Sequence, residues 1–122
     1  MATRSQMMEQ ILRNLVGGTP DLEGSAVVST DGLVLASALP TGTDEDRVSA
    51  MAAALLSLGE RTSKELARGT LDQVYVKGDS GYVVLMRAGS ESVLEAIAGS
   101  NAKLGMVLLD MKRAAAELGK IV

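Results

Sequence analysis

The segment TDEDRVSAMAAALLSLGERTSKELAR, residues 43–68, is the longest stretch of the chain without proline or a cluster of turn residues. At about 100° per residue, its apolar positions form one stripe along a predicted helix. We expect this stripe to pack on the protein's own core. Its members are Val48, Met51, Ala52, Leu55, Leu58, Gly59, Thr62 and Leu66.

The apolar arc of this helix is wider than one contact with a sheet requires. Leu56 and Ala54 lie on opposite edges of the stripe and widen the arc to roughly 200°, whereas packing on a sheet needs about 100°. Small residues on the remaining face would let a second helix approach closely, although alanines also simply favour helix formation. We therefore predict a dimer contact on this helix. The predicted contact residues are Ala50, Ala53, Leu56, Ser57 and Glu60.

The composition of the chain excludes several classes of function. The chain has 122 residues, 47% apolar and 22% charged, which is typical of one folded domain, here residues 1–122. Its net charge of −3 and the lack of a basic run argue against a general nucleic-acid binder. Cys and His are both absent, so Cys and His nucleophiles, disulfides and nearly all zinc sites are excluded. We expect a protein that is not an enzyme and holds no cofactor or metal.

The hydropathy pattern argues against a protein that inserts into a membrane. No apolar run approaches the roughly 20 residues of a membrane span, and polar residues such as Glu9 and Arg13 interrupt the N-terminal segment. We therefore expect a cytoplasmic protein without membrane insertion. Phe and Trp are absent and only two Tyr occur, which removes most stacking platforms for bases or cofactors.

Helical spacing of apolar residues predicts two further helices. The first covers residues 4–16, and Gly17 and Gly18 follow it as expected left-handed caps. A closing amphipathic helix covers residues 104–118. For the long helix of residues 43–68 we expect Thr43 to be the N-cap, with acidic residues in the first turn.

A hairpin is predicted between the first two helices. Two short apolar runs, residues 25–30 and 33–39, are joined by Asp31-Gly32, which is the strongest two-residue hairpin signal of the chain. Both runs are apolar on both faces, so we expect helices to cover both sides of the sheet.

Three more strands are predicted after the long helix. Residues 71–77 alternate in polarity and contain Lys77, which is typical of an edge strand. Residues 82–87 are apolar on both faces and indicate a central strand. Residues 93–98 read as the fifth strand, with Glu95 as the one residue out of place; a short helix is the alternative.

The sequence contains no motif for catalysis or phosphate binding. No Gly-x4-Gly-Lys-Ser/Thr or GxGxxG spacing is present. Serines have no histidine partner, which argues against a serine hydrolase. The acidic cluster Asp44, Glu45 and Asp46 is better explained as helix capping than as a metal site, because consecutive carboxylates on a helix diverge.

The order of these elements resembles the roadblock family, that is, dynein light chain roadblock and MglB-like proteins. The resemblance covers nearly the whole chain and consists of patterns of residue type. The segments that carry it are AVVSTDGLVLASAL (26–39), DEDRVSAMAAALLSLGERTSKEL (44–66), DQVYVKGDSGYVVLMRAG (72–89) and NAKLGMVLLDMKRAAAEL (101–118).

The resemblance implies an α+β fold of three layers, α/β/α, with a profilin-like architecture. A five-stranded antiparallel sheet would carry the long helix on one face and the two terminal helices on the other. It also implies a homodimer, or a heterodimer with a paralogue, through the long helix and the adjacent third strand. In this chain the corresponding strand residues are Gln73, Tyr75 and Lys77.

The resemblance further implies a functional partner, a small Ras-like GTPase. Family members either raise GTP hydrolysis or serve as a platform, and the family has no invariant catalytic residue to carry over. Arg61, Lys64 and Arg68 are the residues we expect on the surface facing the GTPase. Two alternatives stay open: a small-ligand sensor of the PAS or GAF type, and an assembly scaffold of a motor or motility complex.

Overall fold

The computed structural model describes every residue from 1 to 122. Three helices and five strands follow one another in the order expected from the sequence. Their bounds are α1 (Arg4–Gly18), β1 (Leu22–Ser29), β2 (Val34–Ala38), α2 (Glu45–Glu65), β3 (Gln73–Gly78), β4 (Gly81–Arg87), β5 (Ser92–Gly99) and α3 (Leu104–Gly119).

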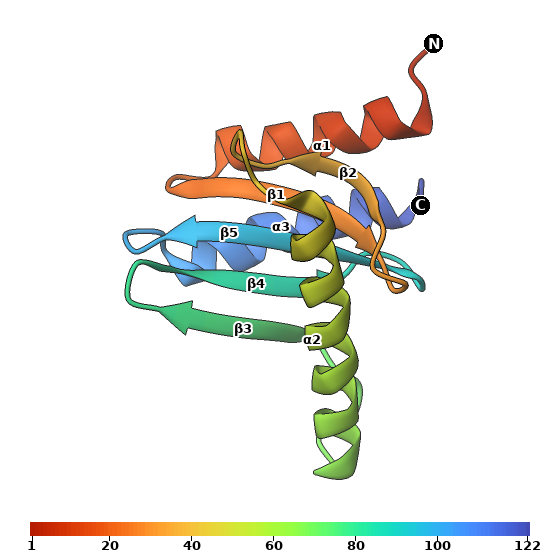
Figure 1. Ribbon diagram of the computed structural model, residues 1–122, viewed down its shortest axis with the longest axis vertical. Coiled ribbons are helices and arrows are strands. Elements are labelled where there is room, and N and C mark those ends of the chain that lie inside the picture. Colours follow the sequence, from red (N-terminus) through yellow and green to blue (C-terminus); the bar gives the residue numbers. More distant parts are fainter.

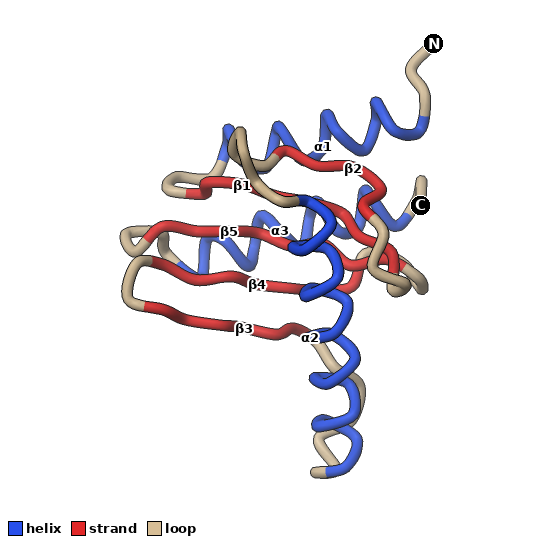
Figure 2. Tube along the Cα trace, viewed as in Figure 1, coloured by secondary structure: helices blue, strands red, loops and turns tan.

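The five strands form one antiparallel sheet in the order β2-β1-β5-β4-β3 (Figure 2). The hairpin at Asp31-Gly32 is confirmed, and Gly32 takes a positive φ of 90° in its turn. The prediction of β3 as an edge strand and of β4 as a central strand is also confirmed. Residues 93–98 are a strand and not a helix, and β5 occupies the centre of the sheet.

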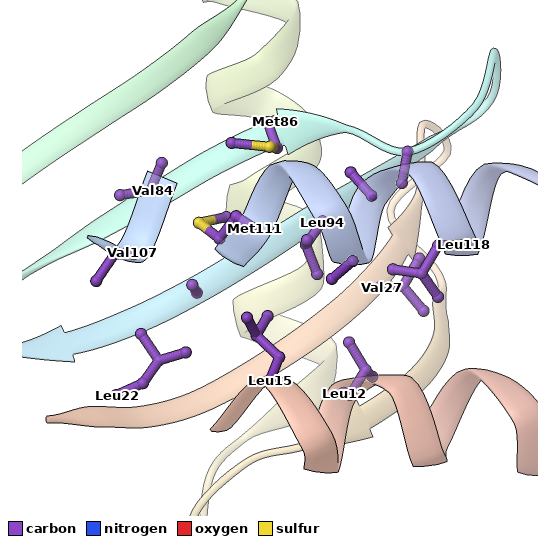
Figure 3. Packing of buried hydrophobic residues seen from close by; sticks show 14 of the residues in the cluster. Leu12, Leu15, Leu22, Val27, Val84, Met86, Leu94, Val107, Met111 and Leu118 are labelled. Carbon is purple, nitrogen blue, oxygen red and sulfur yellow. The ribbon is translucent and has the colours of Figure 1, made fainter. Parts of the chain in front are cut away.

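Helices cover both faces of the sheet, as the apolar strands indicated. Helices α1 and α3 lie on one face and α2 crosses the other (Figure 1). The larger core, of 17 buried residues, lies between the sheet and the pair α1 and α3. Figure 3 shows Leu12 of α1 and Leu118 of α3 near Val27 of β1 in this core. The α+β fold class with three layers is therefore confirmed.

Helix α2 rests on a much smaller core. Ala52 and Leu56 of the helix pack on Leu85 of β4 and Val93 of β5. The helix runs across the strands and continues beyond β3, the edge of the sheet (Figure 1). The C-terminal part of α2 therefore has no strand of its own chain beneath it.

The rotation of α2 about its axis differs from the prediction. Three residues assigned to its core-facing stripe are exposed: Met51 by 53%, Leu58 by 58% and Leu66 by 63%. Leu56, which was placed at the edge of the stripe, and Ser49 are buried instead. The apolar arc is too wide to specify one orientation, and small residues such as Ser49 and Ala52 allow the closest approach to the sheet. The helix therefore packs on the sheet through the side that carries Ser49 and Ala52 and leaves several larger side chains in solvent.

The helix caps also differ in detail from the prediction. Asp44, and not Thr43, is the N-cap of α2, and its carboxylate accepts a hydrogen bond from the Arg47 amide at 3.1 Å. The Thr43 hydroxyl donates instead to the Pro40 carbonyl at 2.6 Å. Helix α1 includes Gly17 and Gly18, the two glycines that we expected to cap it, and its C-cap is Thr19.

Gly59 allows α2 to approach β3, and replacing it tests this contact. A Cβ at Gly59 would lie 2.8 Å from Cγ2 of Val74, so α2 would have to move. We expect Gly59→Ala to lower the free energy of unfolding by about 1–3 kcal/mol through overpacking. Gly17→Ala in α1 meets nothing within 4 Å and should be neutral or stabilise by up to about 1 kcal/mol. Urea unfolding of both variants measures the difference, and equal stabilisation would contradict the close approach.

Candidate functional site

An apolar surface without a partner lies where α2 crosses the sheet. We define the α2 stripe as the exposed or half-buried apolar residues on one side of this helix. It consists of Met51, Leu55, Leu58 and Leu66. On the same face of the sheet, Val76 of β3 is 44% exposed. Its register partner Val83, and Ile97 opposite Val83, are half-buried. The helix and the uncovered part of the sheet thus form one continuous apolar surface.

Strand β3 borders this surface with an open edge. It pairs only with β4, so its outer side presents unpaired backbone N–H and C=O groups. Gln73, Tyr75 and Lys77 alternate with Val74 and Val76 and therefore point to the face of α1 and α3. A free strand edge of this kind is a template for pairing with another strand.

Tyr75 packs against Tyr82 of β4 and is 41% exposed. Its ring meets the Tyr82 ring edge-on at a centroid distance of 5.3 Å and an angle of 61°. The Tyr82 hydroxyl donates to the Ala102 carbonyl at 3.1 Å. Burial and the neighbouring Tyr75 raise the pKa of Tyr82. The aromatic pair therefore fixes the side chains at this edge.

The structure does not bring the predicted dimer residues of α2 together on one free surface. Ala50 and Ala53 lie beside the β1–β2 turn, where Gly32 would place a Cβ 3.5 Å from the Ala50 Cα. Ser57 is exposed on that same side of the helix. Leu56 is only 2% exposed and packs within its own chain. The α2 stripe was missed because the sequence pattern had assigned it to the core.

Glu60 has a partner within the chain. It forms an ion pair with Arg87 at the end of β4, and the second guanidinium nitrogen of Arg87 donates to the Ser90 carbonyl at 2.9 Å. Both side chains are about one third exposed. The pair fastens α2 to the sheet near the point where the helix leaves it.

The three basic residues expected on a partner surface cluster at the C-terminal end of α2 and just after it. Arg61, Lys64 and Arg68 are exposed, and none of them forms an ion pair within the chain. Arg61 and Lys64 belong to the last turns of α2, and Arg68 follows the helix. Their charges are therefore available to a partner that approaches α2.

A buried carboxyl group lies in the central strand, on the face of the sheet that carries α2. Glu95 is two residues from Val93 and therefore points to the same face; its register neighbours are Ala26 and Leu85. It is 5% exposed, and its Oε1 has no hydrogen-bond partner. Burial raises the pKa of this carboxyl from 4.5 to about 7. The residue that looked out of place in the sequence is thus a titratable group in an apolar setting.

The raised pKa of Glu95 makes folding stability depend on pH. Because the folded form has the higher pKa, Glu95 contributes stability that is present below pH 4.5 and is lost as the pH rises to about 7. The loss amounts to about 3 kcal/mol, since one pKa unit corresponds to about 1.4 kcal/mol.

Glu95→Gln should therefore remove this part of the pH dependence. We expect the difference in unfolding free energy between the variant and the wild type to grow by about 3 kcal/mol in favour of the variant from pH 4 to pH 8. Chemical denaturation at a series of pH values measures it. A constant difference across that range would show that Glu95 is ionised at its ordinary pKa.

The fold and its open α2 surface define a protein of the roadblock class. The chain belongs to the Roadblock/LC7 domain family, whose model matches residues 8–98. It is 38% identical over 112 residues to the uncharacterized protein MJ1340 of Methanocaldococcus jannaschii, covering 92% of this chain and 96% of the relative. It is 39% identical over 109 residues to MJ0310 of the same organism, covering 89% and 94%. The resemblance drawn from the sequence is confirmed.

Solved structures show the same fold. A Roadblock/LC7 domain from Streptomyces avermitilis matches with a TM-score of 0.86 at 26% identity, over 90% of this chain and 92% of that one. The gliding protein MglB of Thermus thermophilus matches with 0.88 at 20% identity, over 99% and 92%. Profilin II of Acanthamoeba castellanii matches with 0.68 at 15% identity, over 93% and 97%. The profilin-like architecture is thereby confirmed.

Two further findings concern membranes and metals. None of the three helices combines the length and the apolar character that crossing a bilayer requires. His, Cys, Asp and Glu side chains do not gather in groups of three or more that could hold a metal ion.

Proposed function

We propose that this protein is a cytoplasmic, non-enzymatic regulator or scaffold of a small Ras-like GTPase and that it acts as a homodimer. The observation that carries the proposal is the unpartnered α2 stripe beside the open edge of β3. An apolar surface of this extent on a Roadblock/LC7 chain is a protein–protein contact. The GTPase partner is supported by the resemblance to MglB-like proteins.

A two-fold axis beside β3 would cover the α2 stripe and pair the free edge of β3 in a single dimer contact. Pairing of β3 with β3 of a second copy would satisfy the free backbone groups of both edges. The same rotation would bring the protruding end of each α2 over the uncovered sheet face of the other copy. Val76, Val83 and the α2 stripe would then lose their contact with water. A two-fold contact of this kind is self-complementary, as homodimer interfaces require.

The energetics favour this arrangement over an isolated chain. Burying a Leu or Met side chain contributes about 1.5–3 kcal/mol, and each copy has three such side chains in the α2 stripe that are more than half exposed. Because these side chains are already partly buried, six of them in a dimer would contribute roughly half of that sum, about 5–9 kcal/mol. Together with the strand pairing, this is of the same order as the loss of rotational and translational freedom, about 4–15 kcal/mol.

The paired α2 helices would form the surface for the GTPase. Arg61, Lys64 and Arg68 would line its ends, where their exposed charges can meet acidic or phosphate groups of a partner. A surface of fixed shape can hold the mobile switch segments of a GTPase in one conformation. This action requires no catalytic group in the regulator itself.

The side of α2 that forms the dimer can be tested by substitution. We expect wild-type protein to show twice the chain mass in light scattering at micromolar concentration. Leu58→Arg should give a monomer, because it places a charge in the α2 stripe. Ala50→Arg, on the opposite side of the same helix, should leave the dimer intact. A monomeric wild type, or dissociation by Ala50→Arg and not by Leu58→Arg, would refute the proposed dimer.

The GTPase partner can be tested separately. A small Ras-like GTPase from the same cell should co-elute with the protein or change its rate of GTP hydrolysis by at least tenfold, an effect of about 1.4 kcal/mol. Leu58→Arg should abolish the effect because the paired helices are lost. If no such GTPase from that cell binds or responds, the regulatory role fails while the dimer stands on its own measurement.

A further inference from the structure

The outward face of α3 carries mainly basic and apolar side chains, with Glu117 as the exposed acidic side chain at its border. Val107, Met111 and Leu118 face the sheet, so residues on the opposite side of the helix point to solvent at spacings of three and four. We call these residues the α3 stripe. They are Met106, Leu109, Lys112, Arg113, Ala116 and Lys120. We propose that the α3 stripe is a docking surface for an anionic lipid membrane.

The apolar part of the α3 stripe has no partner within the chain. Met106 is 47% exposed and Leu109 is 51% exposed, although the opposite side of the same helix is fully buried. The two side chains are one helical turn apart and therefore lie next to each other. They form a protruding apolar contact at the start of α3.

The basic side chains of the α3 stripe outnumber their acidic neighbours, because only Glu117, one helical turn from Arg113 and Lys120, and Asp110 lie beside them. Lys112 and Lys120 form no ion pair. Arg113 lies 3.9 Å from Asp110, but its side chain remains 71% exposed. Asp110 also accepts a hydrogen bond from the Thr19 hydroxyl at 2.8 Å, which holds this carboxylate toward α1. The charges of the α3 stripe therefore face solvent.

The charge of the whole molecule is divided between its layers. Helices α1 and α3 with their caps carry six basic and three acidic side chains, whereas the rest of the chain carries six basic and twelve acidic ones. A molecule with this asymmetry turns its positive layer toward an anionic surface. The acidic layer beyond the sheet weakens this attraction little, because screening at physiological salt acts within about 8 Å.

A lipid surface fits the α3 stripe better than a nucleic acid or an acidic protein. Nucleic-acid phosphates offer nothing to Met106 and Leu109, and the stripe contains no aromatic side chain for base stacking. Helix α3 lies on the sheet on the side opposite α2 (Figure 1), and the α3 stripe is the side of this helix that faces away from the sheet. Apolar side chains would enter the headgroup region while Lys and Arg contact the lipid charges.

The proposed dimer would strengthen this attachment. Pairing through β3 would extend the sheet and keep both copies of α3 on one face, opposite the paired α2 helices. Two α3 stripes would then bind one membrane together, which raises the apparent affinity without new contacts. The gain in apparent affinity rests on the dimer of the proposed function, whereas membrane binding by a single copy does not.

The test is co-sedimentation with vesicles, using variants on the two faces of the molecule. One set of vesicles contains phosphatidylcholine alone, and the other contains about one third phosphatidylserine. The α3 variant combines Lys112→Gln, Arg113→Gln and Lys120→Gln. The control variant combines Arg61→Gln, Lys64→Gln and Arg68→Gln, which changes the net charge equally on the α2 side. Circular dichroism checks that both variants are folded.

We expect wild-type protein to sediment with anionic vesicles at about 0.1 M salt and to be released at higher salt. The α3 variant should lose about fivefold in affinity per charge, or about 100-fold in total, and the α2 control should bind as the wild type does. Leu109→Ser should weaken binding without altering its salt dependence. Dissociation of the dimer by Leu58→Arg should weaken but not abolish binding.

Three results would overturn the proposal. One is equal sedimentation with neutral and anionic vesicles. Another is equal loss of binding in the α3 and α2 variants, which would show an effect of net charge alone. The last is absence of vesicle binding together with retention on polyglutamate or DNA, which would assign the α3 stripe to a polyanionic macromolecule. Each result leaves the GTPase measurement unaffected, because that measurement uses no vesicles.

Discussion

The seating of α2 on the sheet through small side chains is the contact on which the outer surfaces of this protein depend. Ala52 and the neighbouring Ser49 bring the helix axis close to the strands, and Gly59 extends this approach to β3. A helix seated on its small side turns its larger side chains outward. The exposed α2 stripe is therefore a direct result of how the helix is held, and the Glu60–Arg87 ion pair keeps that rotation in place.

The two faces of the sheet serve different purposes. The face of α1 and α3 holds the 17-residue core and thus most of the buried apolar surface. The face of α2 has a core of four buried residues and leaves part of the sheet uncovered. The larger core can hold the five strands together while the other face stays open to partners. Such a division suits a protein that acts through its surface.

Much of the fold could be predicted from the sequence because each element has a clear local pattern. Asp31-Gly32 specifies a turn, and Lys77 in an alternating strand marks an edge. Glu95 signalled an unusual position, although only the structure shows that the carboxyl is buried on the α2 face without a partner for Oε1. Local patterns of this kind depend on a few neighbouring residues and can be recognised in a single sequence.

The orientation of α2 could not be predicted from the sequence, because the choice is made by contacts between distant residues. A helix with a wide apolar arc can pack on the sheet in several rotations about its axis. Which rotation is adopted depends on contacts such as the close approach of Val74 and Leu71 to Gly59. The sequence pattern alone places the dimer contact on the side of Ala50 and Ala53, and the α2 stripe lies on the other side of the helix. The α3 stripe could not be predicted for a similar reason. Its charged residues look like an ordinary solvated helix face until the burial of the opposite side of α3 is known.

The unequal size of the two cores has a consequence for cooperativity. The small core under α2 lies on the opposite face of the sheet from the larger one, so we expect less free energy to be needed to detach α2 than to unfold the sheet with α1 and α3. Opening of this kind is a sub-global event with a free energy below that of complete unfolding. A partner that holds α2 down would raise the protection of its amide protons against exchange and leave that of the rest of the molecule unchanged.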